Sequence, residues 1–516
     1  MDIFGSLLGG FGSLFVSPMM IAAVVAAVIA GMVVGALPGL TATMAMALFL
    51  PFTFLMEPDI GLSVLMGLFA GGIAGGSIPA ILLNVPGTPA SAATALDGYA
   101  MTKRGRAREA LSMAMFASAI GGVVSALLLS VLAPLIARLA LNFQAPEFFV
   151  LAIYGLTIIA AVAGKSLLKG YVSGLIGLVV GLVGLDPISG QLRLTFGNPE
   201  FNGGISLIPV LIGVFGITQA LVLIRQSSTT GAPPAMSGPR WLTRTDLKNS
   251  GTTIARGSLI GTAIGVIPGT GTDIGAFLSY SEAKRRPKGE IPFGKGNPQG
   301  VAASESANNA VVGGAMIPMM TLGIPGEAGT AVLLGGLLIH GLTPGPQLFT
   351  GEQSSLVYTI FATFILANIL ILVVGLVAAR VFSYVVRIPT HVIVPVIITL
   401  CLIGAYAINN RFTDVIVAVV FGVLGYFMVT HDFPVSPVIL GMILGPMAEV
   451  NFRRAMTITG GDWTVFFTRP ASILFWVLIV VSLIYVWRSG KKQQKGMDTL
   501  LDEGSTDSVR VPRSID

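Results

Sequence analysis

The chain has 516 residues, of which 53% are hydrophobic and only 10% are charged, and its mean hydropathy is +0.85. Soluble domains carry roughly a quarter of charged residues, so this composition predicts an all-α polytopic membrane protein. The net charge of +6 does not predict a nucleic-acid partner, because the basic residues cluster in short loops between apolar runs. In such loops, basic residues determine the orientation of the chain in the membrane. We therefore expect membrane lipid as a partner.

Cysteine and histidine are too sparse for the usual metal centres. The single Cys401 excludes a disulfide framework and a cysteine-rich site, and the three histidines lie far apart in the sequence. We therefore predict no resident metal and no cofactor. The first Lys or Arg is Lys103, so a cleavable signal peptide with a basic start is not expected. The first apolar run is read as a permanent span.

The first half of the chain is a series of apolar runs. They cover residues 21–37, 43–56, 60–85, 110–141, 148–163, 171–185 and 205–224. The acidic turn at 57–59 and the basic loop at 103–108 interrupt them. We assign residues 1–225 to a first transmembrane repeat.

A polar linker rich in Pro, Gly and Ser, at 226–253, separates this repeat from a second one, at 254–488. The apolar runs of the second repeat are 254–267, 274–280, 302–322, 328–339, 356–386, 392–408, 415–429, 435–447 and 473–486. At about 20 residues per span, the two halves together give roughly ten to thirteen membrane segments, some of them short or re-entrant. Residues 489–516 are expected to form a disordered cytoplasmic tail.

Four Pro-Gly pairs interrupt these apolar runs, at 38–39, 86–87, 268–269 and 325–326, each close to Thr, Ser or Asn. Inside hydrocarbon every backbone N–H and C=O needs a partner, so such breaks persist only where protein or a wet cavity surrounds them. Broken helices of this kind commonly mark the substrate and ion sites of secondary transporters.

The breaks recur in the same order in the two halves. GALPGLT at 35–41 matches GVIPGTG at 265–271, and IPAILLNVPGTPASA at 78–92 matches IPMMTLGIPGEAGTA at 317–331. The offsets are 230 and 239 residues, and the second motif keeps its two prolines seven residues apart. Chance similarity between Gly-rich apolar segments is the alternative, but two ordered motifs favour an internal repeat.

Loop charge favours opposite orientations for the two halves. The acidic turn follows the first motif of the first half, and the basic loop 103–108 follows its second motif. In the second half, the basic loop KRRPK follows the first motif, and no Lys or Arg then occurs from 296 to 379. Basic loops mark the cytoplasmic side, so matching loops lie on opposite faces, as in inverted repeats. The basic ends of both halves argue against this arrangement.

The segment 257–282 lies between two basic regions and is too short for two full spans. We therefore predict a helical hairpin with PGTGTD at its tip. Such a tip would present free backbone N–H groups and helix N-termini to an anion, while carbonyls and Asp273 would hold a cation. The alternative is a Gly-Pro kink that only eases packing.

Acidic residues at membrane depth are costly and therefore suggest function. Asp273 is the strongest candidate, followed by Glu305 and Glu327, of which Glu327 comes directly after a Pro-Gly break. The polar segment SESANN at 304–309 is either part of a site or the start of a helix that emerges into solvent.

Several enzyme classes have no support in the sequence. A phosphate-binding loop needs GxxxxGK[ST], but Ile159 stands where the first Gly before Gly164-Lys165-Ser166 should be. No nucleophile lies beside a histidine or a carboxylate pair, so we do not expect an enzyme. An ion or solute channel and a membrane-embedded lipid-modifying enzyme stay open as alternatives.

The motifs GALPGLT, NVPGTPASAATALDGYAM, GVIPGTGTDIGAFLSYSEAKRRPK, FGKGNPQGVAASESANNAVVGG and IPMMTLGIPGE resemble the large membrane subunit of the tripartite tricarboxylate transporter family. The resemblance is dense from about 31 to 345. It implies a multi-pass permease of the bacterial inner membrane, driven by an ion gradient. It also implies two partners, a small membrane subunit and a periplasmic solute-binding protein that captures carboxylates such as citrate.

We predict that the carboxylate binds between the broken helices of the two halves. It would be imported by cation symport, with Na⁺ or H⁺ as the coupling ion. The predicted substrate contacts are Pro38, Gly39, Thr41, Thr43, Asn84, Pro86, Gly87, Thr88, Pro268, Gly269, Thr270, Gly271, Thr272, Pro325 and Gly326. The predicted cation ligands are Asp273, Ser304, Asn308, Asn309 and Glu327.

Overall fold

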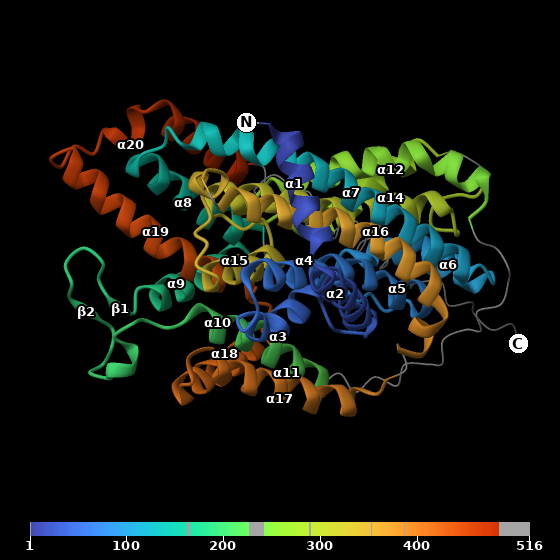
Figure 1. The fold of residues 1–516 in the computed structure, drawn as a ribbon, viewed down its shortest axis with the longest axis horizontal. Coiled ribbons are helices and arrows are strands. Elements are labelled where there is room, and N and C mark those ends of the chain that lie inside the picture. The colour runs from blue at the N-terminus through green and yellow to red at the C-terminus, as the bar shows by residue number, and fades with distance from the viewer. Residues whose placement is uncertain are drawn as a thin grey trace, which may run out of the picture.

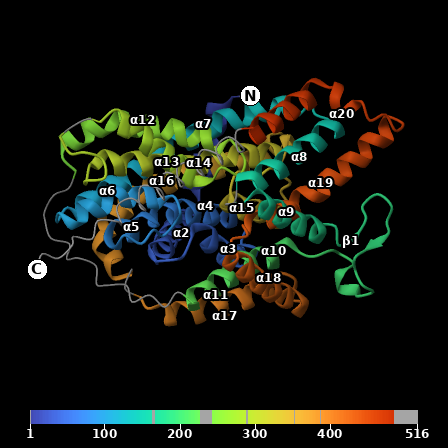
Figure 2. The same ribbon diagram turned by 180° about the vertical axis from the view of Figure 1, so that it is seen from behind.

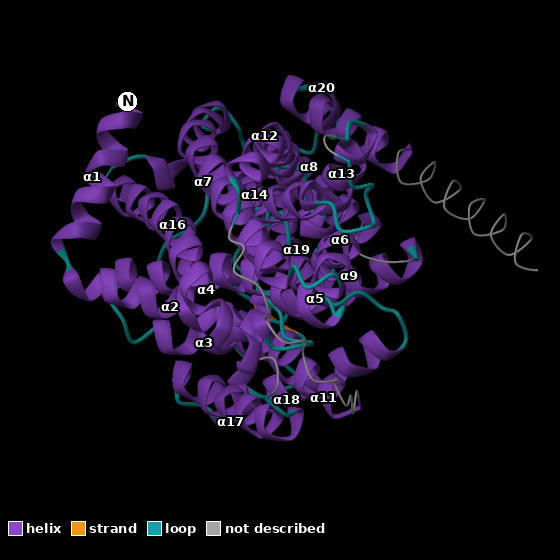
Figure 3. Cartoon of the chain, turned by 90° about the vertical axis from the view of Figure 1, so that its right-hand side faces the viewer, coloured by secondary structure: helices purple, strands orange, loops and turns teal. Residues whose placement is uncertain are grey.

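The computed structural model describes residues 2–162, 166–225, 242–287, 290–351, 353–385 and 388–484. The predicted tail at 489–516 and most of the predicted linker lie outside these residues. The described part is almost entirely helical (Figure 3), and its one two-stranded sheet pairs β1 (Gly184–Leu185) with β2 (Leu192–Arg193) in antiparallel fashion. Within it, seven helices are long and apolar enough to cross a membrane. The prediction of an all-α polytopic membrane protein is confirmed.

The first half begins with one helix that the apolar runs did not include, α1 (Ile3–Val16). Its remaining helices are α2 (Pro18–Ala36), α3 (Ala42–Thr53), α4 (Pro58–Gly75), α5 (Ser77–Leu83), α6 (Ser91–Lys103), α7 (Ala107–Ala140), α8 (Ala145–Val162), α9 (Leu167–Gly181), the 3-10 turn η1 (Pro199–Phe201), α10 (Leu207–Leu211), the π-helix η2 (Ile212–Ile217) and α11 (Thr218–Arg225).

The second half begins with α12 (Arg244–Gly265), which starts earlier than the span expected at 254 because Thr243 and Asp246 form a capping box. It continues with α13 (Gly271–Arg285), α14 (Pro298–Leu322), α15 (Ala328–Ile339), the 3-10 turn η3 (Pro346–Phe349), α16 (Gln353–Val385), α17 (Thr390–Asn409), α18 (Phe412–Thr430), α19 (Ser436–Ile458) and α20 (Val465–Thr468).

The core of the molecule is a bundle in which α14 packs against α7 and α12, α2 packs against α4, and α7 packs against α16. Figures 1 and 2 show these helices running close together through the middle of the molecule. Helices α11, α17 and α18 lie along one edge, and the β1–β2 hairpin projects at one end. The bundle therefore brings segments from both halves of the chain side by side.

Two helix pairs, one in each half, approach so closely that only glycine fits between them. A Cβ atom added at Gly35 of α2 would lie 2.3 Å from the carbonyl oxygen of Gly72 in α4. A Cβ atom added at Gly265 of α12 would lie 2.3 Å from the carbonyl oxygen of Val311 in α14. Gly265 and Val311 follow Gly35 and Gly72 by 230 and 239 positions, the offsets of the sequence motifs.

The breaks themselves also have matching backbone conformations. Gly39 and Gly269 have φ values of 83° and 81°, in the region that favours glycine. Asn84 and Gly323 end α5 and α14 in the left-handed conformation, with φ values of 58° and 72°. These matches support the prediction of an internal repeat. The opposite orientation of the two halves in the membrane stays a prediction.

The segment 257–282 folds as α12 and α13 joined by a short turn. Gly257 of α12 lies beside Ser279 of α13, and Gly261 lies beside Gly275. Because residues before and after the turn pair in reverse order, the two helices run antiparallel and form a helical hairpin. Its tip, at 266–270, contains the Pro-Gly break, as predicted.

Candidate functional site

A cavity of about 420 Å³ lies where four helices begin. Thr41 stands at the start of α3, Thr88 just before α6, Thr270 at the start of α13 and Glu327 at the start of α15. The first N–H groups of a helix have no partner within the helix, and its N-terminus carries a partial positive charge. Four such ends around one cavity form an environment suited to an anion.

Hydrogen bonds within the turns hold these helix starts in place. The Gly269 N–H donates to the Gly326 carbonyl oxygen at 2.7 Å and so joins the breaks of α12–α13 and α14–α15. The Thr270 hydroxyl donates to the Ile264 carbonyl oxygen at 2.7 Å. The Thr41 hydroxyl accepts from the Met44 N–H at 3.2 Å. These two threonines therefore shape the turns before α3 and α13.

Two acidic side chains, Asp273 and Glu327, face the cavity. The charge of Asp273 acts on the Glu327 carboxyl, and the Thr272 N–H points to the same carboxyl. Glu327 Oε1 is buried and accepts no hydrogen bond from the described residues. Among the described residues that line the cavity, none is Lys or Arg. Two neighbouring carboxylates without a basic partner repel each other, and a bound cation would relieve that repulsion.

Nine of the predicted site residues line this one cavity. They are Thr41, Thr43, Thr88, Gly269, Thr270, Gly271, Thr272, Asp273 and Glu327. They come from both halves of the chain and from all four Pro-Gly breaks. Six other predicted residues belong to the same turns without lining the cavity: Pro38, Gly39, Gly87, Pro268, Pro325 and Gly326. The sequence motifs thus converge on one cavity through their backbone geometry.

Asn84 and Pro86 are exposed and lie outside the cavity, so the structure does not bring them together with the other predicted substrate contacts. Asn84 ends α5, and residues 85–87 then return to the cavity in a non-helical conformation. The left-handed conformation of Asn84 is a helix C-cap, which asparagine tolerates well. The asparagine at position 84 therefore indicates the end of a helix.

The predicted cation ligands separate into two groups. Asp273 and Glu327 line the cavity, but Ser304, Asn308 and Asn309 are buried in the interior of α14 and do not reach it. Asn309 donates to the Asn368 side chain of α16 at 3.4 Å. The structure therefore does not place these three residues at the cavity with Asp273. The alternative that 304–309 emerges into solvent is wrong, because these residues are buried.

Gln219, on α11, is a cavity residue that the sequence analysis missed. Its side-chain amide donates to the carbonyl oxygen of Gly39, at the first Pro-Gly break. It follows η2, a π-helix, and such helices occur frequently at functional sites. The sequence feature that could have identified this residue is the amide side chain of Gln219 inside the apolar run at 205–224. Ser436, at the start of α19, also lines the cavity and was missed.

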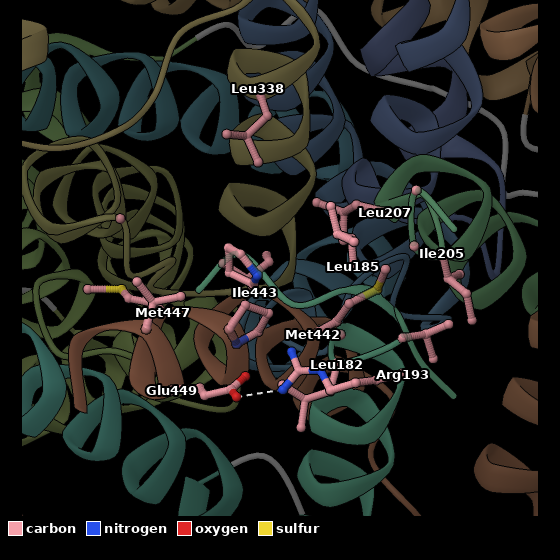
Figure 4. Close-up of a pocket in the computed structure, with 18 of the residues that line it drawn as sticks. Leu182, Leu185, Arg193, Ile205, Leu207, Leu338, Met442, Ile443, Met447 and Glu449 are labelled. Atoms are coloured by element: carbon pink, nitrogen blue, oxygen red, sulfur yellow. Dashed lines mark hydrogen bonds and ion pairs between the residues drawn. The ribbon is translucent and has the colours of Figure 1, made fainter. Parts of the chain in front are cut away.

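A second cavity, of about 790 Å³, lies between the β1–β2 hairpin, α15 and α19. Figure 4 shows its mainly apolar lining, with the ion pair between Arg193 and Glu449 at one side. It is larger than the first cavity, but the four helix starts do not line it. Since Arg193 is paired with Glu449, we place the site for an anion in the smaller cavity.

Asp186 fixes the β1–β2 hairpin onto α19. Arg453 donates to its carboxylate at 2.6 Å and, with the Ile188 N–H, holds the pKa of that carboxyl well below its usual range. A lowered carboxyl pKa stabilises the folded state above the usual aspartate pKa of about 4, and the effect is lost as pH falls through the lower folded value.

We therefore expect the hairpin to stay docked from pH 8 to pH 5, and Arg453→Met to loosen it at both values, although the pair between Arg193 and Glu449 remains. Hydrogen exchange of residues 184–193 checks this, with the exposed Arg454→Met as control. Equal protection in the wild type and in Arg453→Met would show that the ion pair does not hold the hairpin.

Comparison with known proteins gives a family match over most of the chain. Residues 21–440 match the model of the tripartite tricarboxylate transporter TctA family. An uncharacterised 52.8 kDa protein of the TAR-I ttuC′ 3′ region of Agrobacterium vitis is 37% identical over 92% of this chain and 94% of its own length. An uncharacterised protein of the TAR-II ttuC′ 3′ region of the same organism is 39% identical over 43% of this chain and 93% of its own length.

Proposed function

The chain belongs to the tripartite tricarboxylate transporter TctA family, and from this premise we propose that it imports tricarboxylates or related carboxylates by cation symport. It would do so in the bacterial inner membrane, with a small membrane subunit and a periplasmic solute-binding protein that delivers the substrate. Family membership and the apolar helices make the chain a multi-pass membrane transport protein.

The observation that carries this proposal is the convergence of four helix starts on one cavity. A tricarboxylate has several negative charges, and the positive ends of α3, α13 and α15 would receive them through backbone N–H groups. At the start of α6 the Thr88 N–H already donates to the Ser91 hydroxyl, so this helix would contribute only its partial positive charge. Such half-helix ends are the usual means by which transporters bind anionic groups. The substrate would therefore lie between the two halves of the chain.

Asp273 and Glu327 are the residues that would require a cation in the same cavity. A carboxylate substrate beside two further carboxylates is repelled unless positive charge enters with it. Binding of a cation at Asp273 and Glu327 would remove that repulsion. In this way the cavity itself would link substrate binding to the coupling ion, Na⁺ or H⁺.

The thermal stability of the purified protein tests the binding step. We expect citrate to raise the melting temperature in a cation-dependent way, because a ligand that binds only the folded state stabilises it by mass action. The monocarboxylate acetate, at the same ionic strength, should have a smaller effect. Equal shifts for citrate and for acetate would contradict a site built for several carboxyl groups.

Gln219→Leu should reduce citrate uptake, because it leaves the Gly39 carbonyl oxygen without its hydrogen-bond donor. An unsatisfied acceptor costs about 1–3 kcal/mol, enough to disorder the turn before α3. Gln347→Leu, an exposed amide in η3, is the matched control and should transport normally. If Gln219→Leu takes up citrate at the wild-type rate, the Gln219 contact is not required at the site.

A further inference from the structure

Glu305 is a fully buried carboxyl group outside the cavity, in the middle of the helix bundle. The Ser118 hydroxyl of α7 donates to its carboxylate at 2.9 Å, and the Thr94 hydroxyl of α6 contacts its other oxygen. Thr94 also contacts the Ser304 hydroxyl at 3.0 Å. Asn308, one turn along α14, lies beside the same carboxyl. Glu305 therefore joins three helices through hydroxyl groups alone.

Within the described part of the chain, Glu305 has no basic partner. The only side chains that act on its carboxyl are neutral: Thr94, Ser118 and Asn308. Acidic groups of the surrounding helices have other partners: Asp97 contacts Tyr280, Glu109 pairs with Arg106, and Glu282 pairs with Arg256 and Arg286. Asp273 acts on Glu327 at the cavity, and Lys103 of α6 lies over the Tyr99 ring. A lone charge at membrane depth costs several kcal/mol, so the carboxyl needs a bound positive charge.

We propose that Glu305 carries an exchangeable proton whose binding and release are coupled to the import described above, on which this inference rests. The hydroxyl oxygens of Thr94 and Ser118 lie within hydrogen-bond distance of the Glu305 carboxyl oxygens, and Thr94 lies within the same distance of the Ser304 hydroxyl. These oxygens therefore contact one another directly. A metal cation would have to move these oxygens apart, whereas a proton fits the contacts as they are. The Glu305 site is thus separate from the cation site at Asp273 and Glu327.

The position of Glu305 suits a relay between the cavity and one face of the protein. Thr94 lies in the first turn of α6, six residues after Thr88, which lines the cavity. One turn in the other direction, Asp97 accepts the Gly296 and Asn297 N–H groups at 2.8 Å each. These residues end the loop before α14, in which Gly294 and Lys295 are exposed.

The exchange step is a simple acid dissociation. The O–H bond of the Glu305 carboxyl breaks, the proton passes to water at the loop, and the electron pair stays on the carboxylate oxygen. The Asn308 amide, which makes no hydrogen bond of ordinary geometry to the described residues, then supplies a donor to the new carboxylate. A proton from water on the other side restores the acid.

Glu305→Gln tests the proposal, because it resembles a permanently protonated carboxyl. The variant and the wild type are reconstituted in proteoliposomes with the small membrane subunit and the binding protein. We expect Glu305→Gln to lose citrate uptake driven by a pH gradient and to keep the exchange of labelled for unlabelled citrate. The exposed Glu57→Gln should retain both activities.

Infrared difference spectra between acid and alkaline pH give an independent readout. The wild type should show a carboxylic-acid carbonyl band that Glu305→Gln lacks, whether or not the variant transports. Unchanged pH-driven uptake in a folded Glu305→Gln protein would overturn the proposal. The proposal would also be overturned if Na⁺ alone drives uptake by the wild type and Glu305→Gln abolishes this activation by Na⁺. Wild-type protein that moves no citrate in either assay would instead contradict the proposed function.

Discussion

Gly265→Leu is expected to prevent correct folding and to abolish transport. Gly265 lies where α12 crosses α14, and even a Cβ atom there would be 2.3 Å from the Val311 carbonyl oxygen. Overpacking in a core costs about 1–3 kcal/mol, and a clash with backbone cannot be relieved by a change of rotamer. The two helices must separate, and the Gly269–Gly326 contact at the cavity is then lost.

Gly251→Leu is the matched control on the same helix, because a Cβ atom at Gly251 would meet no heavy atom within 4 Å. Leucine is also a better helix former than glycine by about 1 kcal/mol. Size-exclusion profiles, melting temperatures and citrate uptake should therefore separate the two variants. A folded, fully active Gly265→Leu protein would show that the close α12–α14 crossing is not needed.

The same contact in the first half gives a further test of the internal repeat. Gly35→Leu should reproduce the defect of Gly265→Leu, because Gly35 meets Gly72 at the same distance. Different outcomes at the two glycines would mean that the two helix crossings are not equivalent.

The second large effect is expected for Asp273→Asn together with Glu327→Gln. This double variant keeps the shape of the cavity but removes both carboxylates. Charge-assisted interactions contribute about 1.5–3 kcal/mol each, which corresponds to a loss in cation-dependent uptake of about 10- to 100-fold for one carboxylate and about 100- to 10,000-fold for both. Because both residues line the cavity, citrate exchange should fall as well as net uptake, in contrast to Glu305→Gln.

Uptake by Asp273→Asn, measured over a range of cation concentrations, separates the two residues. If Asp273 holds the cation, more cation should be needed for half-maximal uptake. Full ion-coupled uptake with wild-type cation dependence would remove Asp273 from the mechanism. Asp246→Asn, in the capping box on the surface of α12, is a suitable control for the carboxyl-to-amide change.

The sequence located the candidate site because its residues are tied to backbone breaks. Adjacent Pro and Gly residues mark turns, so the breaks before Thr41, Thr88, Thr270 and Glu327 could be predicted without a structure. That the four turns meet at one cavity depends on the packing of α2 on α4 and of α12 on α14. Only the matching motifs hinted at this arrangement.

Other features depended on tertiary contacts that leave little trace in the sequence. Asn308 and Asn309 belong to a cluster of polar residues next to an apolar run and were assigned to the same site as Asp273. Their helix instead carries them into the α7 and α16 interface. Gln219 reaches Gly39 from a segment 180 positions later, a contact that hydropathy does not encode. The α1 helix was missed because it precedes the apolar runs.

The measurement that tests the central claim most directly is labelled-citrate uptake into proteoliposomes that contain this chain and its small membrane partner. It is made with and without the binding protein, under an imposed Na⁺ or proton gradient and without ATP. We predict gradient-dependent uptake that requires the binding protein. If no carboxylate enters although the binding protein is loaded with ligand, the chain is not the permease of a carboxylate symporter.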